Sequence, residues 1–132
     1  MSSTQSIESV RSPAVASLFY PGNPLELQQN IQELLDEASQ DVDLPDDRIL
    51  RALIVPHAGY VYSGSTAAKA YRLLNNYHDE FRRIILLGPA HRVWIEGLAF
   101  PGVEAFETPM GRIPLAVTQI RELLRFPEVQ LL

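Results

Sequence analysis

Residues 51–64 read RALIVPHAGYVYSG, an apolar run that stops abruptly at a proline, a histidine and a glycine. A short apolar run closed by such residues is typical of a strand buried in a parallel sheet. We therefore predict a buried strand over residues 49–55. Residues 83–92 read RIILLGPAHR and repeat the pattern, so they predict a second buried strand over residues 83–87.

A helix is predicted between these two strands. Ser63 or Ser65 could cap its start, and Asn75–Asn76 suit its end. Its apolar positions recur at helical spacing, at Ala67, Ala70, Tyr71 and Leu74. A strand, a helix and a strand with a crossover of this length form a parallel βαβ unit. The expected fold class is α/β, with a mixed, largely parallel sheet and flanking helices.

An earlier helix is predicted upstream of this unit. Asn23 is suited to cap it, Pro24 suits its first position, and Glu26 completes a capping box. Apolar residues at helical spacing carry this helix to near Ser39, where a polar, acidic loop follows.

Downstream of the unit, the pattern becomes more broken. Residues 97–101 favour a third strand, and residues 107–116 are rich in turn residues. Apolar positions then predict a last helix over residues 117–125. Residues 129–132 are apolar enough to be the start of another buried strand.

The length and composition describe one soluble domain. The chain has 132 residues, of which 46% are hydrophobic and 20% charged, and this is the size and composition of a single globular domain. We expect residues 1–12, which are mostly polar, to form a disordered N-terminal tail. Residues 13–132 are then expected to form a single α/β domain.

The bulk properties also argue against several classes of function. The net charge of −5 and the scattered arginines argue against nucleic acid as a partner. There are no cysteines for a disulfide or a thiolate metal site. No apolar run approaches the ~20 residues that span a bilayer, and the first residues lack the pattern of a secretory signal. We expect a cytoplasmic protein without membrane contact.

Two histidines are the main candidates for chemistry. His57 and His91 each follow one of the predicted strands within a few residues. Because parallel strands end at the same edge of a sheet, both imidazoles are expected at one site. Two imidazoles suit iron, zinc, copper or nickel. Prolines and glycines around them permit tight turns, at Pro56, Gly59, Gly64, Gly88 and Pro89.

Plainer interpretations of these residues stay open. A histidine in such a loop is more often a hydrogen-bonded surface residue than a metal ligand, and His78, in a polar stretch, is expected to be solvated. Gly59 and Gly64 with the following helix start could hold an anion, although their spacing matches no nucleotide-binding motif. The tyrosines of this segment could simply cover the edge of the core.

Four segments of the chain together resemble the Memo family, also called AmmeMemoRadiSam system protein B. The resemblance runs from about residue 11 to residue 113, and the histidine-containing segments are its most specific part. The four segments are RSPAVASLFYPGNP (11–24), PHAGYVYSGSTAAKAY (56–71), ILLGPAHR (85–92) and ETPMGRIPL (107–115).

The resemblance implies a fold like that of the class III extradiol ring-cleavage dioxygenases, with a phosphorylase/hydrolase-like α/β core and a metal-site pocket. It implies that His57 and His91 are metal ligands for iron or copper, with non-haem dioxygenase or redox chemistry. The expected pocket lining is Tyr60, Tyr62, Ser63, Gly59, Gly88 and Pro89, and a tyrosine hydroxyl could donate to a bound oxygen. Some family members are described as adaptors for phosphotyrosine peptides.

The chain also departs from the family pattern. It resembles only the N-terminal half, and the third ligand of the family is a cysteine from the second half, so the expected site is incomplete. Ala116 replaces an aspartate and Met110 a leucine. We expect a truncated domain that forms a homo-oligomer or joins a complementing second-half chain, because an exposed apolar edge invites pairing. A non-catalytic module that binds a metal, a small molecule or a peptide, and an inactive remnant, stay open as alternatives.

Overall fold

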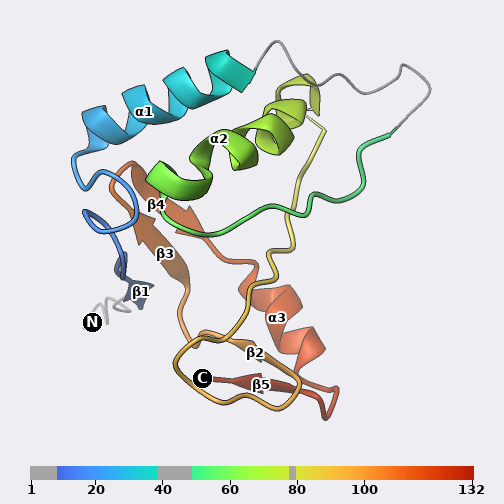
Figure 1. Cartoon of the computed structure of the whole chain (residues 1–132). Helices are drawn as coiled ribbons and strands as arrows, with labels where there is room; N and C mark the ends of the chain where they lie inside the picture. Colours follow the sequence, from blue (N-terminus) through green and yellow to red (C-terminus); the bar gives the residue numbers. More distant parts are fainter. Residues whose placement is uncertain (1–8, 39–48, 78–79) are drawn as a thin grey trace, which may run out of the picture. The chain divides into compact units, whose positions relative to one another are not determined.

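The computed structural model describes residues 9–38, 49–77 and 80–132, and the chain divides into two compact units (Figure 1). One unit comprises residues 14–82, and the other comprises residues 1–13 and 83–132. The positions of the two units relative to one another are not determined. Three expectations lie wholly or partly outside the described residues: the start of the tail, the helix end near Ser39 and the setting of His78.

In the unit of residues 14–82, α1 (Pro24–Glu37) confirms the predicted first helix. The Asn23 side chain accepts hydrogen bonds from the backbone N–H groups of Leu25 and Glu26, at 2.9 and 3.2 Å. These bonds satisfy two amides that a helix start otherwise leaves without partners. Asn23 therefore fixes where α1 begins, as its sequence context predicted.

The second helix, α2 (Tyr60–Tyr71), packs against α1 and continues as the 3₁₀ helix η2 (Arg72–Tyr77) (Figure 1). Gly64 is buried at this contact, and a Cβ there would lie 3.0 Å from Leu34 Cδ1. A small residue at this position thus permits the close approach of the two helices. Leu27 and Ala68 are buried on the same helices.

The start of α2 differs from the prediction. The helix begins at Tyr60 with Gly59 as its N-cap, so neither Ser63 nor Ser65 caps it. The Ser63 hydroxyl instead donates a hydrogen bond back to the carbonyl of Ala58, at 3.1 Å. Tyr60 and Tyr62 therefore lie in the first turn of a helix and not in a loop. The glycines around them in the sequence did not indicate a helix start at Tyr60.

The second unit contains a three-stranded sheet in the order β1–β3–β4, with β1 (Val10–Arg11), β3 (Ala105–Thr108) and β4 (Gly111–Pro114). β1 pairs parallel with β3, and β3 pairs antiparallel with β4. The hairpin turn is stabilised by the Thr108 hydroxyl, which accepts from the Met110 N–H at 3.2 Å and donates to the Gly111 carbonyl at 3.0 Å. The segment of residues 107–116, which we predicted to be rich in turns, thus contains the end of β3, the hairpin turn and β4.

The same unit holds a parallel strand pair and the last helix. β2 (Leu98–Phe100) pairs with β5 (Val129–Leu131), which confirms a strand in each of these predicted places. Gly97 has φ +80 and lies against the Glu128 carbonyl so closely that a side chain there would collide. α3 (Val117–Leu123) confirms the predicted last helix, although it ends two residues early.

The two buried strands that we predicted for residues 49–55 and 83–87 are wrong, and so is the βαβ unit built from them. Neither segment forms a strand, and the side chains of residues 83–90 are exposed. A strand exists only when a neighbouring strand pairs with it, and an apolar run records a tendency toward burial and not the identity of the partner. No described strand pairs with either segment.

The general fold class is nevertheless confirmed. The molecule is α/β, with three α-helices and a mixture of parallel and antiparallel strand pairs in the described part of the chain. The buried apolar residues among those described are few and mostly small: Leu27, Ala38, Leu50, Ala68 and Ala105. None of the described helices is long and apolar enough to cross a membrane.

Candidate functional site

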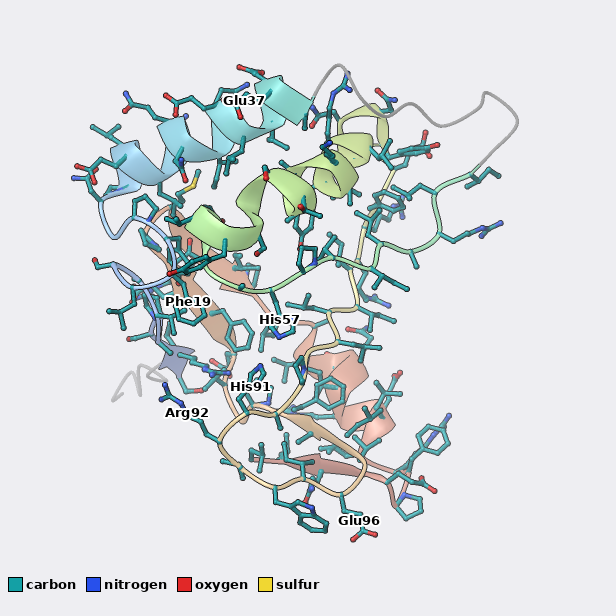
Figure 2. The ribbon with its side chains drawn as sticks, viewed as in Figure 1. Phe19, Glu37, His57, His91, Arg92 and Glu96 are labelled. Atoms are coloured by element: carbon teal, nitrogen blue, oxygen red, sulfur yellow. The ribbon has the colours of Figure 1, made fainter. Side chains whose placement is uncertain are left out.

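His57 lies on the segment that leads into α2, and its side chain is exposed (Figure 2). The backbone immediately after it is held in place by the loop before α1. The Tyr60 N–H donates a hydrogen bond to the Phe19 carbonyl at 2.7 Å. Gly59 lies so close to Phe19 that an added Cβ would be 3.3 Å from the same carbonyl oxygen. A larger residue at this crossing of two chain segments would make a tight contact with the Phe19 backbone.

A second attachment fixes the same turn from the helix side. Ser63 is buried, and its hydroxyl donates to the carbonyl of Ala58, the residue after His57. Together with the bond from Tyr60 to Phe19, this contact holds the backbone beside His57 at two points. The histidine is therefore presented to solvent from a short, well-anchored turn.

His91 lies in the other unit, on the segment between residue 83 and β2 (Figure 2). Its side chain is exposed, as are Gly88 and Pro89 before it. A Cβ on Gly88 would meet no atom within 4 Å, so this glycine is not required by packing. Because the two units are not placed relative to one another, the expected meeting of His57 and His91 stays a prediction.

The described residues contain no group of three or more histidine, cysteine, aspartate or glutamate side chains that could hold a metal ion. Among the described residues, the two candidate imidazoles lie in different units, His57 in the unit of residues 14–82 and His91 in the other. Imidazole nitrogen is a suitable ligand for iron, copper or zinc. The chemistry of these donors fits a transition metal, while their number is smaller than the three protein ligands typical of catalytic sites.

The other expected pocket residues lie in different surroundings. Tyr62 points largely into solvent, with 87% of its surface exposed, whereas Ser63 is buried. Tyr60 is half-buried and packs beside Tyr20, with ring centroids 5.8 Å apart. Burial raises the pKa of the Tyr60 hydroxyl, and the nearby Tyr20 and Tyr71 raise it further. Tyr60 therefore keeps its proton well into the alkaline range.

Tyr60 also lines a pocket that the sequence did not predict. The pocket has a volume of about 700 Å³ and lies between the loop before α1, one side of α1 and the start of α2. Glu26 and Asn30 contribute from α1, and Tyr20 contributes from the loop. The aromatic residues and prolines of the loop before α1 indicate that this loop packs against another part of the molecule. The spacing of residues in the sequence does not predict which side of α1 the loop contacts.

A family profile described as Memo-like protein matches residues 11–131 of the chain. Among curated proteins, the MEMO1 family protein of Aquifex aeolicus (strain VF5) is 32% identical over 118 residues, which cover 89% of this chain and 41% of that protein.

Two further relatives come from distant organisms. The Protein memo-1 homolog of Caenorhabditis elegans is 36% identical over 118 residues, covering 89% of this chain and 31% of the relative. The MEMO1 family protein of Nitrosopumilus maritimus (strain SCM1) is 31% identical over 115 residues, which cover 86% of this chain and 41% of that protein. The chain thus spans less than half the length of the relatives that it matches.

Proposed function

This chain belongs to the Memo-like protein family, and on that premise we propose that it binds a transition-metal ion through the imidazoles of His57 and His91. These are the two histidines that the family resemblance assigns to a metal-site pocket. Both imidazoles are exposed, and each follows an apolar run and a proline. Iron and copper are the ions that the resemblance favours.

The anchored turn beside His57 is the observation that carries this proposal. Hydrogen bonds from Tyr60 to Phe19, at 2.7 Å, and from Ser63 to Ala58, at 3.1 Å, hold the backbone next to the imidazole. A ligand on a backbone that is already ordered loses less conformational entropy when it binds an ion. The local structure thus favours His57 as a ligand over a histidine on an unanchored loop.

The number of metal-ligating side chains decides whether this chain alone can catalyse a reaction or only bind a metal ion. A bound iron or copper ion would supply redox chemistry and open positions for an oxygen ligand. The chain contributes two imidazole nitrogen donors, and no cluster of three ligating side chains exists among the described residues. We therefore propose metal binding without turnover for this chain by itself, and we assign dioxygenase or redox activity only to a protein that supplies a third ligand.

Calorimetric titration with Fe(II), Cu(II) and Zn(II) tests the proposal. We expect His57→Ala and His91→Ala each to weaken the binding of at least one ion by about tenfold or more, because even residues that only orient metal ligands contribute 10–100-fold. The matched control is His78→Ala, which removes the third histidine of the chain. Binding that is equal in all four proteins would refute the metal site.

Oxygen consumption with catechol in the presence of Fe(II) separates binding from catalysis. We expect no turnover above free Fe(II) for this chain, because two imidazoles leave the site short of a ligand. Turnover that disappears in His57→Ala would show that the chain is itself an enzyme and that the non-catalytic part of the proposal is wrong.

A further inference from the structure

The pocket beside α1 is a second potential binding site, separate from the proposed metal ligands. Its volume of about 700 Å³ lies within the range of small-molecule sites, about 300–1,000 Å³. All of its lining residues belong to the unit of residues 14–82, and His57 is not among them. A ligand here would therefore be bound by one unit alone.

The loop that forms one wall of this pocket has a defined backbone. Ser17 adopts the left-handed conformation with φ 65, and its N–H donates to the Tyr20 carbonyl at 2.8 Å. Gly22 lies directly against the Ser17 hydroxyl, where a Cβ would collide with it. A non-glycine residue in this conformation costs energy, and such positions occur more often at functional sites. The wall is thus pre-formed, and a ligand need not order it.

Two tyrosines, Tyr20 and Tyr60, are among the residues that line the pocket. Tyr20 from the loop and Tyr60 from α2 stand with their centroids 5.8 Å apart and their planes tilted by 46°. Both residues line the pocket and are partly exposed. The face of an aromatic ring carries negative electrostatic potential, which attracts cations. This wall favours a positively charged ligand over an anion.

The charged side chain that lines the pocket also favours a positively charged ligand. Among the described residues, Glu26 is the only charged residue that lines the pocket, and no lysine, arginine or histidine of the described ranges does so. None of the described residues forms an ion pair or hydrogen bond with the Glu26 carboxylate, which is exposed. Asn30, one turn further along α1, adds an amide that can accept a hydrogen bond through its oxygen or donate one through its nitrogen. The pocket thus offers acceptors and a negative charge.

We propose that this pocket binds an alkylammonium group, with the Glu26 carboxylate as its counter-charge and the Tyr20 and Tyr60 rings as its aromatic wall. The group can belong to a free amine or to a lysine side chain of a partner peptide. An ammonium ion with an apolar stem matches both the charge and the rings, whereas a carboxylate or phosphate would face Glu26 without a cation to balance it.

Titrations of the full chain followed by ¹H–¹⁵N NMR test the proposal, with metal removed by a chelator. The probes are n-butylammonium, its neutral analogue 1-butanol and its anionic analogue butyrate. We expect n-butylammonium to shift the amide signals of Tyr20, Asn30 and Tyr60, while the other two compounds bind at least about tenfold more weakly. Nα-acetyl-lysine methylamide distinguishes the two sources, since tighter binding of this compound indicates a lysine-containing peptide.

Two substitutions locate the interaction. Glu26→Gln removes the carboxylate but keeps the side-chain shape, and we expect it to weaken n-butylammonium binding by about tenfold. Glu33→Gln on the same helix is the matched control, because Glu33 does not line the pocket. This variant should bind the probe as tightly as the unaltered chain does. The NMR spectra also report whether each variant is folded.

Any of the following outcomes would overturn the proposal: equal binding of butanol, preferential binding of butyrate, or equal effects of the two glutamine substitutions. Absence of any shift with n-butylammonium would overturn it as well. Because the titration contains no metal, each of these outcomes leaves the proposal for His57 and His91 untouched.

Discussion

Tyr60 joins three features of this molecule at one position. It begins α2, its N–H closes the contact to Phe19, and its ring lines the pocket beside Tyr20. Burial disfavours the charged tyrosinate, and for that reason the pKa of its hydroxyl is raised. The unfolded chain lacks this burial, so the two states bind protons differently at alkaline pH.

The sign of the resulting pH dependence follows from proton linkage. Above the ordinary tyrosine pKa of about 10, the unfolded state has lost a proton that folded Tyr60 still holds. The stabilising contribution is complete below that pH and disappears as the pH rises through the higher folded pKa. We expect the free energy of unfolding to fall in this range, and to fall less steeply in Tyr60→Phe, as measured by urea denaturation from pH about 8 to about 11.

Tyr62→Phe provides the control for this effect. Tyr62 lies two residues further along the same helix, but its side chain is 87% exposed. If its replacement flattens the alkaline decline as much as Tyr60→Phe does, the decline does not come from burial of Tyr60.

The helices differ in how their first turns are satisfied. α1 has the Asn23 side chain, which accepts two backbone hydrogen bonds. α3 begins after Ala116, and α2 begins after Gly59, and neither cap forms a side-chain hydrogen bond. At the start of α2, the Tyr60 N–H donates to the Phe19 carbonyl instead, and the Ser63 hydroxyl donates to the Ala58 carbonyl. The starts of α1 and α2 thus depend on different kinds of interaction.

Asn23→Ala should destabilise the protein by about 1 kcal/mol, because two amides at the start of α1 lose their acceptor. Chemical denaturation monitored by circular dichroism measures the change. Gln29→Ala, at an exposed position within α1, is the control and should stay within about 0.5 kcal/mol of the unaltered chain. Equal losses in the two variants would mean that the cap contributes nothing specific.

The molecule as a whole exposes a large apolar surface. Ile84, Ile85, Leu86 and Leu87 form a continuous run with exposed fractions of 72–82%. No described strand pairs with this run. An extended apolar segment with free backbone groups pairs readily with another chain. Self-association is therefore the expected behaviour of this chain in solution.

Light scattering coupled to size-exclusion chromatography tests this expectation. We expect the unaltered chain to elute above the monomer mass and Ile85→Lys to shift it toward the monomer, because a lysine opposes pairing. Leu25→Lys, at a helical position that is 69% exposed, should have little effect. A monomer at all micromolar concentrations would contradict the prediction, as would equal effects of the two lysine substitutions.

The sequence predicted correctly those features that depend on interactions between residues close together in the chain. Asn23, Pro24 and the apolar spacing after them located α1, since a cap bonds to residues two and three positions away. Strands at residues 98–100 and 129–131 were expected in their places. The motif histidines were picked out by their proline and glycine neighbours, and their roles stay predictions.

Long-range contacts were beyond the reach of these signals. The run RIILL predicted a buried strand, yet a strand requires a partner that no local pattern names. The pocket depends on the meeting of the Ser17–Gly22 loop and α1 with the start of α2, which lies about 40 positions after the loop in the chain. The start of α2 was also not visible in the sequence, because Gly59 lies close to Phe19, a residue 40 positions earlier in the chain.

The amino-acid sequence by itself determined the family and the position of α1, because these rest on motif identity and on interactions within a few residues. The α/β class was also predicted correctly, although the βαβ unit from which it was argued does not form. Only the tertiary structure decided where α2 begins, which strands pair and which residues line the pocket beside α1. The physical reason is that pairing and burial depend on contacts between distant segments, and the same apolar run is a buried strand or an exposed segment according to what lies against it.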